Sequence, residues 1–156
     1  MSVQLEDGDR APDFELAGSD DATHTLSEYR GQPVVLVFYP LAFSGVCTRE
    51  HASFCESLPA FDGMAAQVLG ISVDSTPTLK AFAEAGGINY PLLSDFHPRG
   101  AAGRVYGAYD PDTGTHHRWT FVVDSDGRVA HVQRNELGTL PDTVEIVRAV
   151  RDTLDI

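Results

Sequence analysis

The chain has 156 residues, of which 23 are acidic and 11 are basic, so its formal charge at neutral pH is −12. This length suits one domain, and 42% apolar residues suffice for a hydrophobic core, which excludes wholesale disorder. Nucleic acids and anionic membranes attract clusters of basic side chains, whereas this chain has a single lysine, Lys80, and scattered arginines. The composition therefore speaks against nucleic-acid and membrane-surface partners, and no repeat or linker divides residues 1–156.

The acidic excess also fits a protein that works in concentrated salt, because the screening length falls to ~3 Å at 1 M and self-repulsion then costs little. We expect a halophilic cytosol; an ordinary acidic protein is the alternative. Met1–Arg10 is polar and lacks an apolar signal-peptide core, so a cytoplasmic location is expected. The longest apolar stretch, residues 33–43, is shorter than the ~20 residues that span a bilayer.

The first predicted elements are an N-terminal β-hairpin, a strand and a helix. Residues 13–16 and 23–26 alternate between apolar and polar side chains and flank a Gly-Ser-Asp-Asp turn. Residues 34–39 form a continuous apolar run, which is typical of a central strand covered on both faces. The apolar spacing then predicts a helix over 45–58, with Pro59 beyond its end.

A second strand and helix follow, and then a shorter pair. Residues 67–73 are predicted to form a buried strand, and residues 76–85 a helix that stops at two glycines. A short strand is expected within 90–95 and a short helix over 99–106.

The last elements are a hairpin and a helix. Residues 119–124 and 129–133 flank an Asp-Gly turn, and His116 and His117 before them are expected to lie in a solvated turn. Residues 143–154 form an amphipathic pattern that predicts a closing helix. Its sheet-facing side chains are expected to be Val144, Val147, Val150 and Leu154. The order of elements predicts an α/β fold with a mixed central sheet, most simply a thioredoxin-like fold.

The candidate chemistry centres on a cysteine at the start of the first long helix. Two cysteines are too few for a disulfide framework and form no C-x-x-C pair, which disfavours a dithiol reductase and a structural zinc site. With Ser44 as N-cap, Cys47 is the third helical residue, where unpaired N–H groups favour a thiolate. Pro40 can cover its sulfur, and Arg118 can supply a fixed positive charge. Judged alone, Cys47 fits a reactive thiol and an inert buried one equally well.

Two motifs carry a resemblance to a known family. The spacing Pro40-x-x-x-Ser44-x-x-Cys47 resembles the active-site signature of the peroxiredoxins, and residues 118–124 (RWTFVVD) resemble that family's second motif. The likeness covers nearly the whole chain and is closest to the one-cysteine AhpE type, then to the bacterioferritin-comigratory (PrxQ) type. It implies a thiol-dependent peroxidase that reduces hydrogen peroxide and organic hydroperoxides in antioxidant defence, with no bound cofactor and no metal.

The resemblance also implies a role for each matching residue. Cys47 is similar to the peroxidatic cysteine, whose thiolate attacks a hydroperoxide oxygen and becomes a sulfenic acid. Ser44 matches the hydroxyl that binds the peroxide, and Arg118 matches the guanidinium that orients the thiolate and polarises the O–O bond. Pro40 matches the residue that shields the sulfur, and Glu50 the glutamate that bonds the arginine.

The second cysteine has two open interpretations. Eight helical residues separate Cys55 from Cys47, a rise of about 12 Å, whereas disulfide Cα atoms lie within roughly 7 Å. The PrxQ type places a resolving cysteine five residues on and unwinds the helix; this spacing departs from that pattern, and the AhpE type lacks such a residue. A bystander role and a resolving role therefore both stay open.

The resemblance leaves the partners and one alternative function open. The implied reductant is a thioredoxin-like or glutaredoxin-like protein or a low-molecular-weight thiol, and a homodimer is expected only by analogy. The alternative function is a redox-sensing or chaperone-like interaction protein that uses the same oxidisable Cys47 as a signal.

Overall fold

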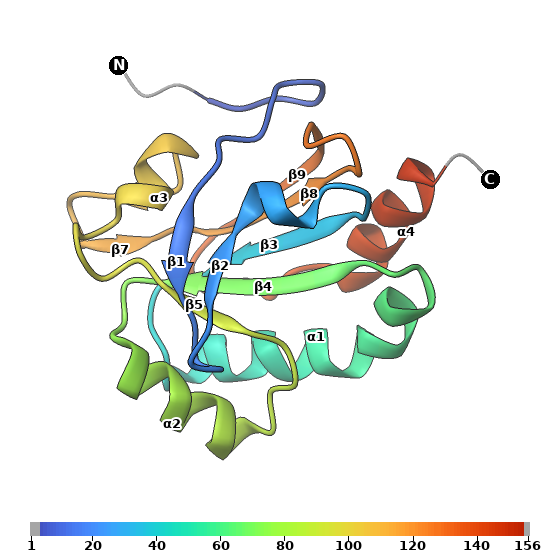
Figure 1. Cartoon of the computed structure of the whole chain (residues 1–156). Helices are drawn as coiled ribbons and strands as arrows, with labels where there is room; N and C mark the ends of the chain where they lie inside the picture. Colours follow the sequence, from blue (N-terminus) through green and yellow to red (C-terminus); the bar gives the residue numbers. More distant parts are fainter. Residues whose placement is uncertain (1–3, 155–156) are drawn as a thin grey trace.

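A five-stranded mixed sheet forms the centre of the computed structural model, which describes residues 4–154 (Figure 1). Its strand order is β5-β4-β3-β8-β9. β3 (Val34–Phe38), β4 (Gln67–Ser72) and β5 (Leu92–Ser94) run parallel, whereas β8 (Arg118–Val123) is antiparallel to β3 and to β9 (Val129–Asn135). All five β3 residues are buried, as expected for a central strand. The predicted mixed α/β sheet is confirmed.

Three helices pack on one face of this sheet. They are α1 (Gly45–Gly63), α2 (Thr76–Gly86) and α4 (Thr143–Thr153), and their apolar side chains form one cluster with alternate residues of β3 and with Val122 of β8. Ser75 before α2 and left-handed Gly87 after it bound that helix where the sequence predicts. The candidate cysteine therefore lies on the face that the helices cover.

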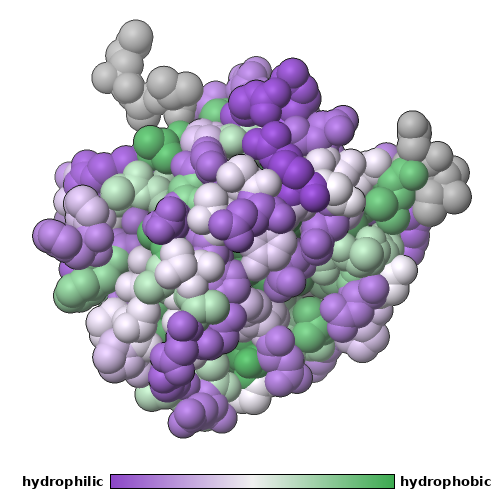
Figure 2. Space-filling view, viewed as in Figure 1, coloured by the Kyte–Doolittle hydropathy of each residue, from purple (hydrophilic) through white to green (hydrophobic). Residues whose placement is uncertain are grey.

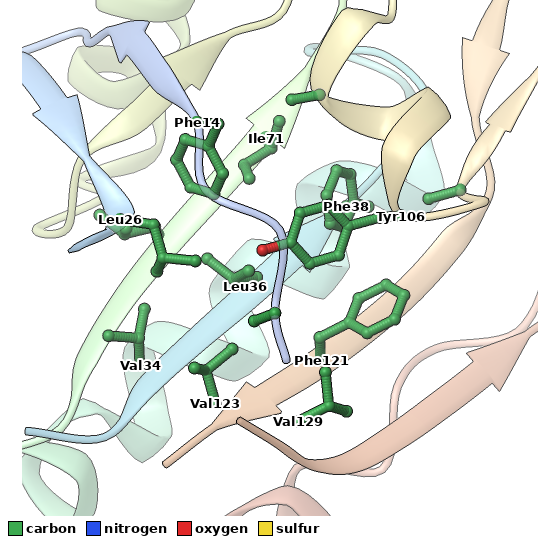
Figure 3. Packing of buried hydrophobic residues seen from close by; sticks show 14 of the residues in the cluster. Phe14, Leu26, Val34, Leu36, Phe38, Ile71, Tyr106, Phe121, Val123 and Val129 are labelled. Atoms are coloured by element: carbon green, nitrogen blue, oxygen red, sulfur yellow. The ribbon is translucent and has the colours of Figure 1, made fainter. Parts of the chain in front are cut away.

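The opposite face is covered by the N-terminal segment, the β1–β2 hairpin, η1 (Leu26–Tyr29) and α3 (Ala101–Val105). β1 (Glu15–Ala17) and β2 (Thr23–Thr25) pair antiparallel, so the predicted hairpin is confirmed with narrower bounds. Figure 3 shows the core on this side, where aromatic and branched side chains of the hairpin segment and α3 meet the sheet. Its labelled residues are Phe14, Leu26, Val34, Leu36, Phe38, Ile71, Tyr106, Phe121, Val123 and Val129.

Two helices differ from their predictions, α1 in where it ends and α4 in which residues it buries. α1 does not stop before Pro59 but continues through it to Gly63. Pro59 cannot donate to the helix, yet Phe61 beyond it is fully buried, and that burial offsets the lost hydrogen bond. In α4 the buried residues are Ile146 and Val150, while Val144 is 66% exposed. Val150 and the partly buried Val147 therefore lie on the predicted face, whereas the prediction of Val144 was wrong and the buried Ile146 was missed.

A small hairpin that the sequence pattern does not reveal precedes β8. It consists of β6 (Tyr109–Asp110) and β7 (Thr115–His116), which pair antiparallel. The expectation of a solvated His116 was wrong, because its ring is fully buried and its Nε2 lies 3.0 Å from an oxygen of buried Asp95. Gly103 leaves the space for this ring, since a Cβ there would come within 2.2 Å of it.

The surface is mixed, with hydrophilic residues spread widely over the face seen in Figure 2 and apolar ones in small groups. None of the described helices has the length and apolar character needed to cross a membrane.

Candidate active site

The loop between β3 and α1 positions the start of the helix. Ser44 has an extended backbone, and its carbonyl accepts hydrogen bonds from the N–H and the hydroxyl of Thr48, both at 2.9 Å. Ser44 is thus the N-cap residue, as predicted, but its side chain donates to the Leu41 carbonyl at 3.1 Å instead of capping the helix. The first-turn N–H groups of α1 therefore stay available to an anion at this end of the helix.

The loop itself is anchored to the neighbouring strand. Asp74, just after β4, accepts a hydrogen bond from the Ala42 N–H at 2.8 Å. Phe43 adopts a left-handed backbone with φ of 66° and leaves its ring 55% exposed. Half-buried Pro40 directly follows the last buried residue of the strand run. These contacts fix the direction in which the chain enters α1.

Cys47 is a fully buried thiol in the first turn of α1, and a single arginine contacts it. Arg118 Nη1 donates to Cys47 Sγ at 3.2 Å and to Glu50 Oε1 at 2.5 Å. Arg118 Nε donates to the Leu137 carbonyl at 2.9 Å, and the arginine itself is only 2% exposed. The guanidinium is therefore held at three points, with one N–H edge directed at the sulfur.

The fold explains why residues so far apart in sequence meet here. β8 is the antiparallel neighbour of β3, and Arg118 begins β8 at the end of the sheet where β3 leads into α1. Cys47 and Glu50 are three residues apart, so they share one face of the helix. The sequence-predicted group of Cys47, Glu50 and Arg118 is thus assembled, with Ser44 and Pro40 in the preceding loop.

Burial dominates the electrostatics of the carboxyl group in this site. It raises the pKa of Glu50 from 4.5 to about 8, although the adjacent Arg118 favours the ionised form. One of its oxygens, Oε2, is buried and has no partner among the described residues. A carboxyl group that keeps its proton near neutral pH leaves the charge of Arg118 free to act on the sulfur of Cys47.

Two further polar residues lie one turn deeper, and the sequence reasoning assigned them no role. His51 is fully buried, and its Nδ1 shares a short hydrogen bond with the hydroxyl of Tyr90. Burial lowers the pKa of His51 from 6.5 to about 3, and Arg118 adds to this. A sequence signal existed, because His51 follows Cys47 by four residues and so falls on the buried face of α1.

Cys55 lies apart from this group, further along α1. It is half-buried, its Sγ lies 4.0 Å from the Gly87 carbonyl, and burial raises the pKa of its thiol. Both cysteines are free thiols. Within residues 4–154, no group of three or more histidine, cysteine and acidic residues is arranged to hold a metal ion.

Comparison with known proteins places the chain in a family. The model of the AhpC/TSA family matches residues 8–132. The chain belongs to this family. It is 40% identical over 139 residues to alkyl hydroperoxide reductase E of Mycobacterium tuberculosis, which covers 88% of this chain and 91% of that protein. It is 39% identical over 157 residues to the selenocysteine-containing peroxiredoxin PrxU of Peptoclostridium acidaminophilum, covering 94% of this chain and 73% of that protein.

Solved structures of the AhpC/TSA family share the fold. Enterococcus faecalis AhpC superimposes with a TM-score of 0.89 at 27% identity, covering 98% of this chain and 94% of that one. Peroxidoxin BcpB from M. tuberculosis gives a TM-score of 0.85 at 30% identity, covering 96% and 98%. The predictions of a peroxiredoxin with a thioredoxin-like fold are confirmed, and the protein is a thiol-dependent peroxidase.

Proposed function

We propose that the protein reduces hydroperoxides with Cys47 as the peroxidatic nucleophile. The single observation that carries this assignment is the guanidinium of Arg118, which donates to the sulfur at 3.2 Å from inside a buried site. A thiolate at this place receives a fixed hydrogen bond and lies over the positive end of a helix. Such donors, already in place before reaction, stabilise the charge that moves during the attack.

The first half-reaction transfers one oxygen to sulfur. The Cys47 thiolate attacks the terminal oxygen of ROOH, the O–O bond breaks, and RO⁻ takes a proton to leave as ROH. Sulfur is oxidised to the sulfenic acid, and the peroxide is reduced. Arg118 orients the thiolate and polarises the O–O bond, and the hydroxyl of Ser44 turns from the Leu41 carbonyl to the peroxide. Glu50 holds Arg118 in place.

The surroundings of the site favour organic hydroperoxides over hydrogen peroxide. Leu41 and Phe43, in the loop before Cys47, are 41% and 55% exposed. Leu137, whose carbonyl holds Arg118, is 48% exposed. An alkyl chain can bury apolar surface against these side chains, at about 25 cal/mol per Å², and hydrogen peroxide cannot.

The second half-reaction reduces the sulfenic acid with a thiol. The thiol sulfur bonds to Cys47, the S–O bond breaks, and the hydroxyl leaves as water with the thiol proton. A thioredoxin-like or glutaredoxin-like protein or a low-molecular-weight thiol supplies this sulfur and then a second one. Because Cys55 lies two turns away in an intact helix, the external thiol is the direct route and Cys55 is a bystander.

Mass spectrometry of peroxide-treated protein tests the fate of Cys55. An intramolecular disulfide between residues 47 and 55 would overturn the bystander assignment and make Cys55 a resolving cysteine. A sulfinic acid or a mixed disulfide confined to Cys47 supports the external route. The Cys55→Ser variant is the matched control and should keep its turnover.

Stopped-flow kinetics test the nucleophile. The wild type should react with cumene hydroperoxide far faster than free cysteine does, and Cys47→Ser should not react. A folded wild type that reacts no faster than free cysteine would refute the peroxidase and favour the sensor alternative. A cytoplasmic location, which suits two free thiols, and a homodimer through exposed apolar residues such as Phe43 stay predictions.

A further inference from the structure

The second half-reaction has a steric requirement that the first lacks. A hydroperoxide is small, but the reducing thiol must bring its own sulfur within bonding distance of Cys47. Cys47 is 0% exposed, and Arg118 occupies one side of its sulfur. If Cys47 is the nucleophile proposed above, on which this inference rests, the first turns of α1 must open before a thiol can reach the sulfenic acid.

One loop holds α1 at two successive turns and therefore opposes this opening. The loop 87–90, directly after α2, places the Tyr90 hydroxyl on His51 Nδ1. One turn further along α1, Cys55 Sγ lies 4.0 Å from the Gly87 carbonyl. Opening the start of α1 past His51 breaks the Tyr90 contact first.

A histidine is unusual at position 51 because the side chains around it are aromatic. Its ring lies edge-on to Tyr39, with centroids 4.2 Å apart, and 5.5 Å from that of Phe82. The backbone of Gly70 lies against it, since a Cβ at that glycine would be 3.2 Å from His51 Cε1. An apolar side chain here would avoid the desolvation cost of the imidazole, but it would leave the buried Tyr90 hydroxyl without a partner unless Tyr90 were also replaced by phenylalanine. The second ring nitrogen of His51, Nε2, is buried with no partner among the described residues.

We propose that His51 is a positioning residue that allows α1 to change from a closed form, in which its first turns are helical, to an open form, in which they are unwound. The hydrogen bond from Tyr90 to His51 limits this opening. An imidazole with one unsatisfied nitrogen makes the closed helix less stable than an apolar pair of side chains at positions 51 and 90 would. The hydroxyl of Tyr90 restores part of that stability in the closed form. The pair thereby sets the rate at which oxidised Cys47 meets a thiol, and it leaves the reaction with peroxide unchanged.

Because His51 can be protonated, it should make the opening of α1 depend on pH, which a purely structural residue would not do. In the closed form burial lowers the pKa of His51 to about 3, whereas in the open form the ordinary value of 6.5 applies. The contribution of neutral His51 to the stability of the closed form is therefore complete above pH 6.5, and it is lost as pH falls toward 3. From pH 7.5 to pH 5.5 the contribution of His51 to the opening equilibrium rises about tenfold.

Glu50 has the opposite effect on the pH dependence of α1 opening, so the experiment must separate its contribution from that of His51. Burial raises its pKa to about 8, so its proton favours the closed form as pH falls. The other titratable or charged groups around His51 are Arg118, Tyr39, Tyr90, Cys47 and Cys55. All of these groups remain when His51 alone is replaced. The ratio of wild type to His51→Leu at each pH therefore isolates the contribution of His51.

The test measures each half-reaction in the Cys55→Ser background, so that only an external thiol can react. Protein oxidised with one equivalent of cumene hydroperoxide is mixed with dithiothreitol at pH 7.5 and at pH 5.5. The double variant His51→Leu/Tyr90→Phe, which leaves neither side chain with an unpaired polar atom, should slow the reaction with dithiothreitol on the order of tenfold at pH 7.5. The ratio of wild type to His51→Leu should grow about tenfold between pH 7.5 and pH 5.5.

The partner residue gives the opposite result. Tyr90→Phe leaves His51 without its hydrogen bond, so the reaction with dithiothreitol should become faster. In the His51→Leu background the same change should instead slow the reaction, because it removes a hydroxyl that His51→Leu leaves buried without a partner. His131→Leu, a partly exposed histidine on β9, is the matched control and should change neither half-reaction. All variants should keep the wild-type rate with peroxide.

Amide hydrogen exchange of α1 provides a readout that needs no turnover. The double variant His51→Leu/Tyr90→Phe should raise the protection of the first turns of α1, and Tyr90→Phe alone should lower it. Equal protection and equal dithiothreitol rates in wild type and the double variant would overturn the inference, as would slower reduction in Tyr90→Phe. A wild type that fails to react with peroxide would refute the proposed function instead, while the exchange data would still decide the role of His51.

Discussion

Replacing Arg118 with methionine tests the central contact of the site. Methionine keeps much of the side-chain volume but removes every donor, so the Cys47 sulfur loses its hydrogen bond at 3.2 Å and Glu50 loses its cation. Loss of one preorganised donor to a developing charge costs about 10²–10³-fold in rate, or roughly 3–4 kcal/mol. We therefore expect the second-order rate constant with cumene hydroperoxide to fall by that factor.

The assay can use the protein's single tryptophan. Trp119 is adjacent to Arg118 on β8 and stacks on His117 with ring centroids 4.8 Å apart, so its fluorescence can report oxidation by stopped flow. The control is Arg104→Met, which removes an exposed arginine that stacks on the Tyr109 ring away from the site. The control should react like the wild type. A rate for Arg118→Met within threefold of the wild type would show that the guanidinium does not assist the attack.

Three further predictions concern stability. Burial raises the pKa of Glu50 from 4.5 to about 8, so the contribution of its protonated form to stability is complete below pH 4.5 and is lost as pH rises through 8. In urea unfolding between pH 5 and 8, Glu50→Gln should therefore reduce the fall of the unfolding free energy with pH. Phe61→Ala should cost about 3–5 kcal/mol in the same assay, whereas a stop of α1 at Pro59 would make it neutral. The melting temperature should rise between 0.1 M and 2 M KCl; a constant value would count against a halophilic setting.

The central strand β3 could be predicted from the sequence because its residues are uniform in character. Residues 34–38 are all apolar and all buried, so no competing pattern obscures them. The end of α1 could not be predicted in the same way, because Pro59 is a strong local signal for a helix end, and only the tertiary burial of Phe61 overrides it. In α4, Val144 and Ile146 fit helical faces equally well until the position of β9 selects one of them.

In the candidate site, contacts within one helix could be predicted from helical spacing in the sequence, whereas contacts between separate elements could not. Cys47 and Glu50 are three residues apart, so helical geometry alone puts them together. Arg118 lies 71 residues after Cys47, and it reaches the sulfur only because β8 pairs with β3. His51 and His116 were missed as buried groups for the same reason, since their partners Tyr90 and Asp95 come from other elements. Helical spacing could place His51 on the buried face of α1, but the partner of a buried polar side chain is predictable only once the element that supplies it is known.

The acidic surface and the buried site respond to salt in different ways. Surface carboxylates repel one another through water, so ions at molar concentration, with a screening length of ~3 Å, remove most of that repulsion. The Cys47 sulfur, Glu50 and Arg118 are at most 2% exposed, so mobile ions cannot come between them. The net charge of −12 should therefore govern stability in salt while leaving the chemistry at sulfur nearly unaffected. A rate constant with a neutral hydroperoxide that fell steeply with KCl would mean that the site is open to solvent ions.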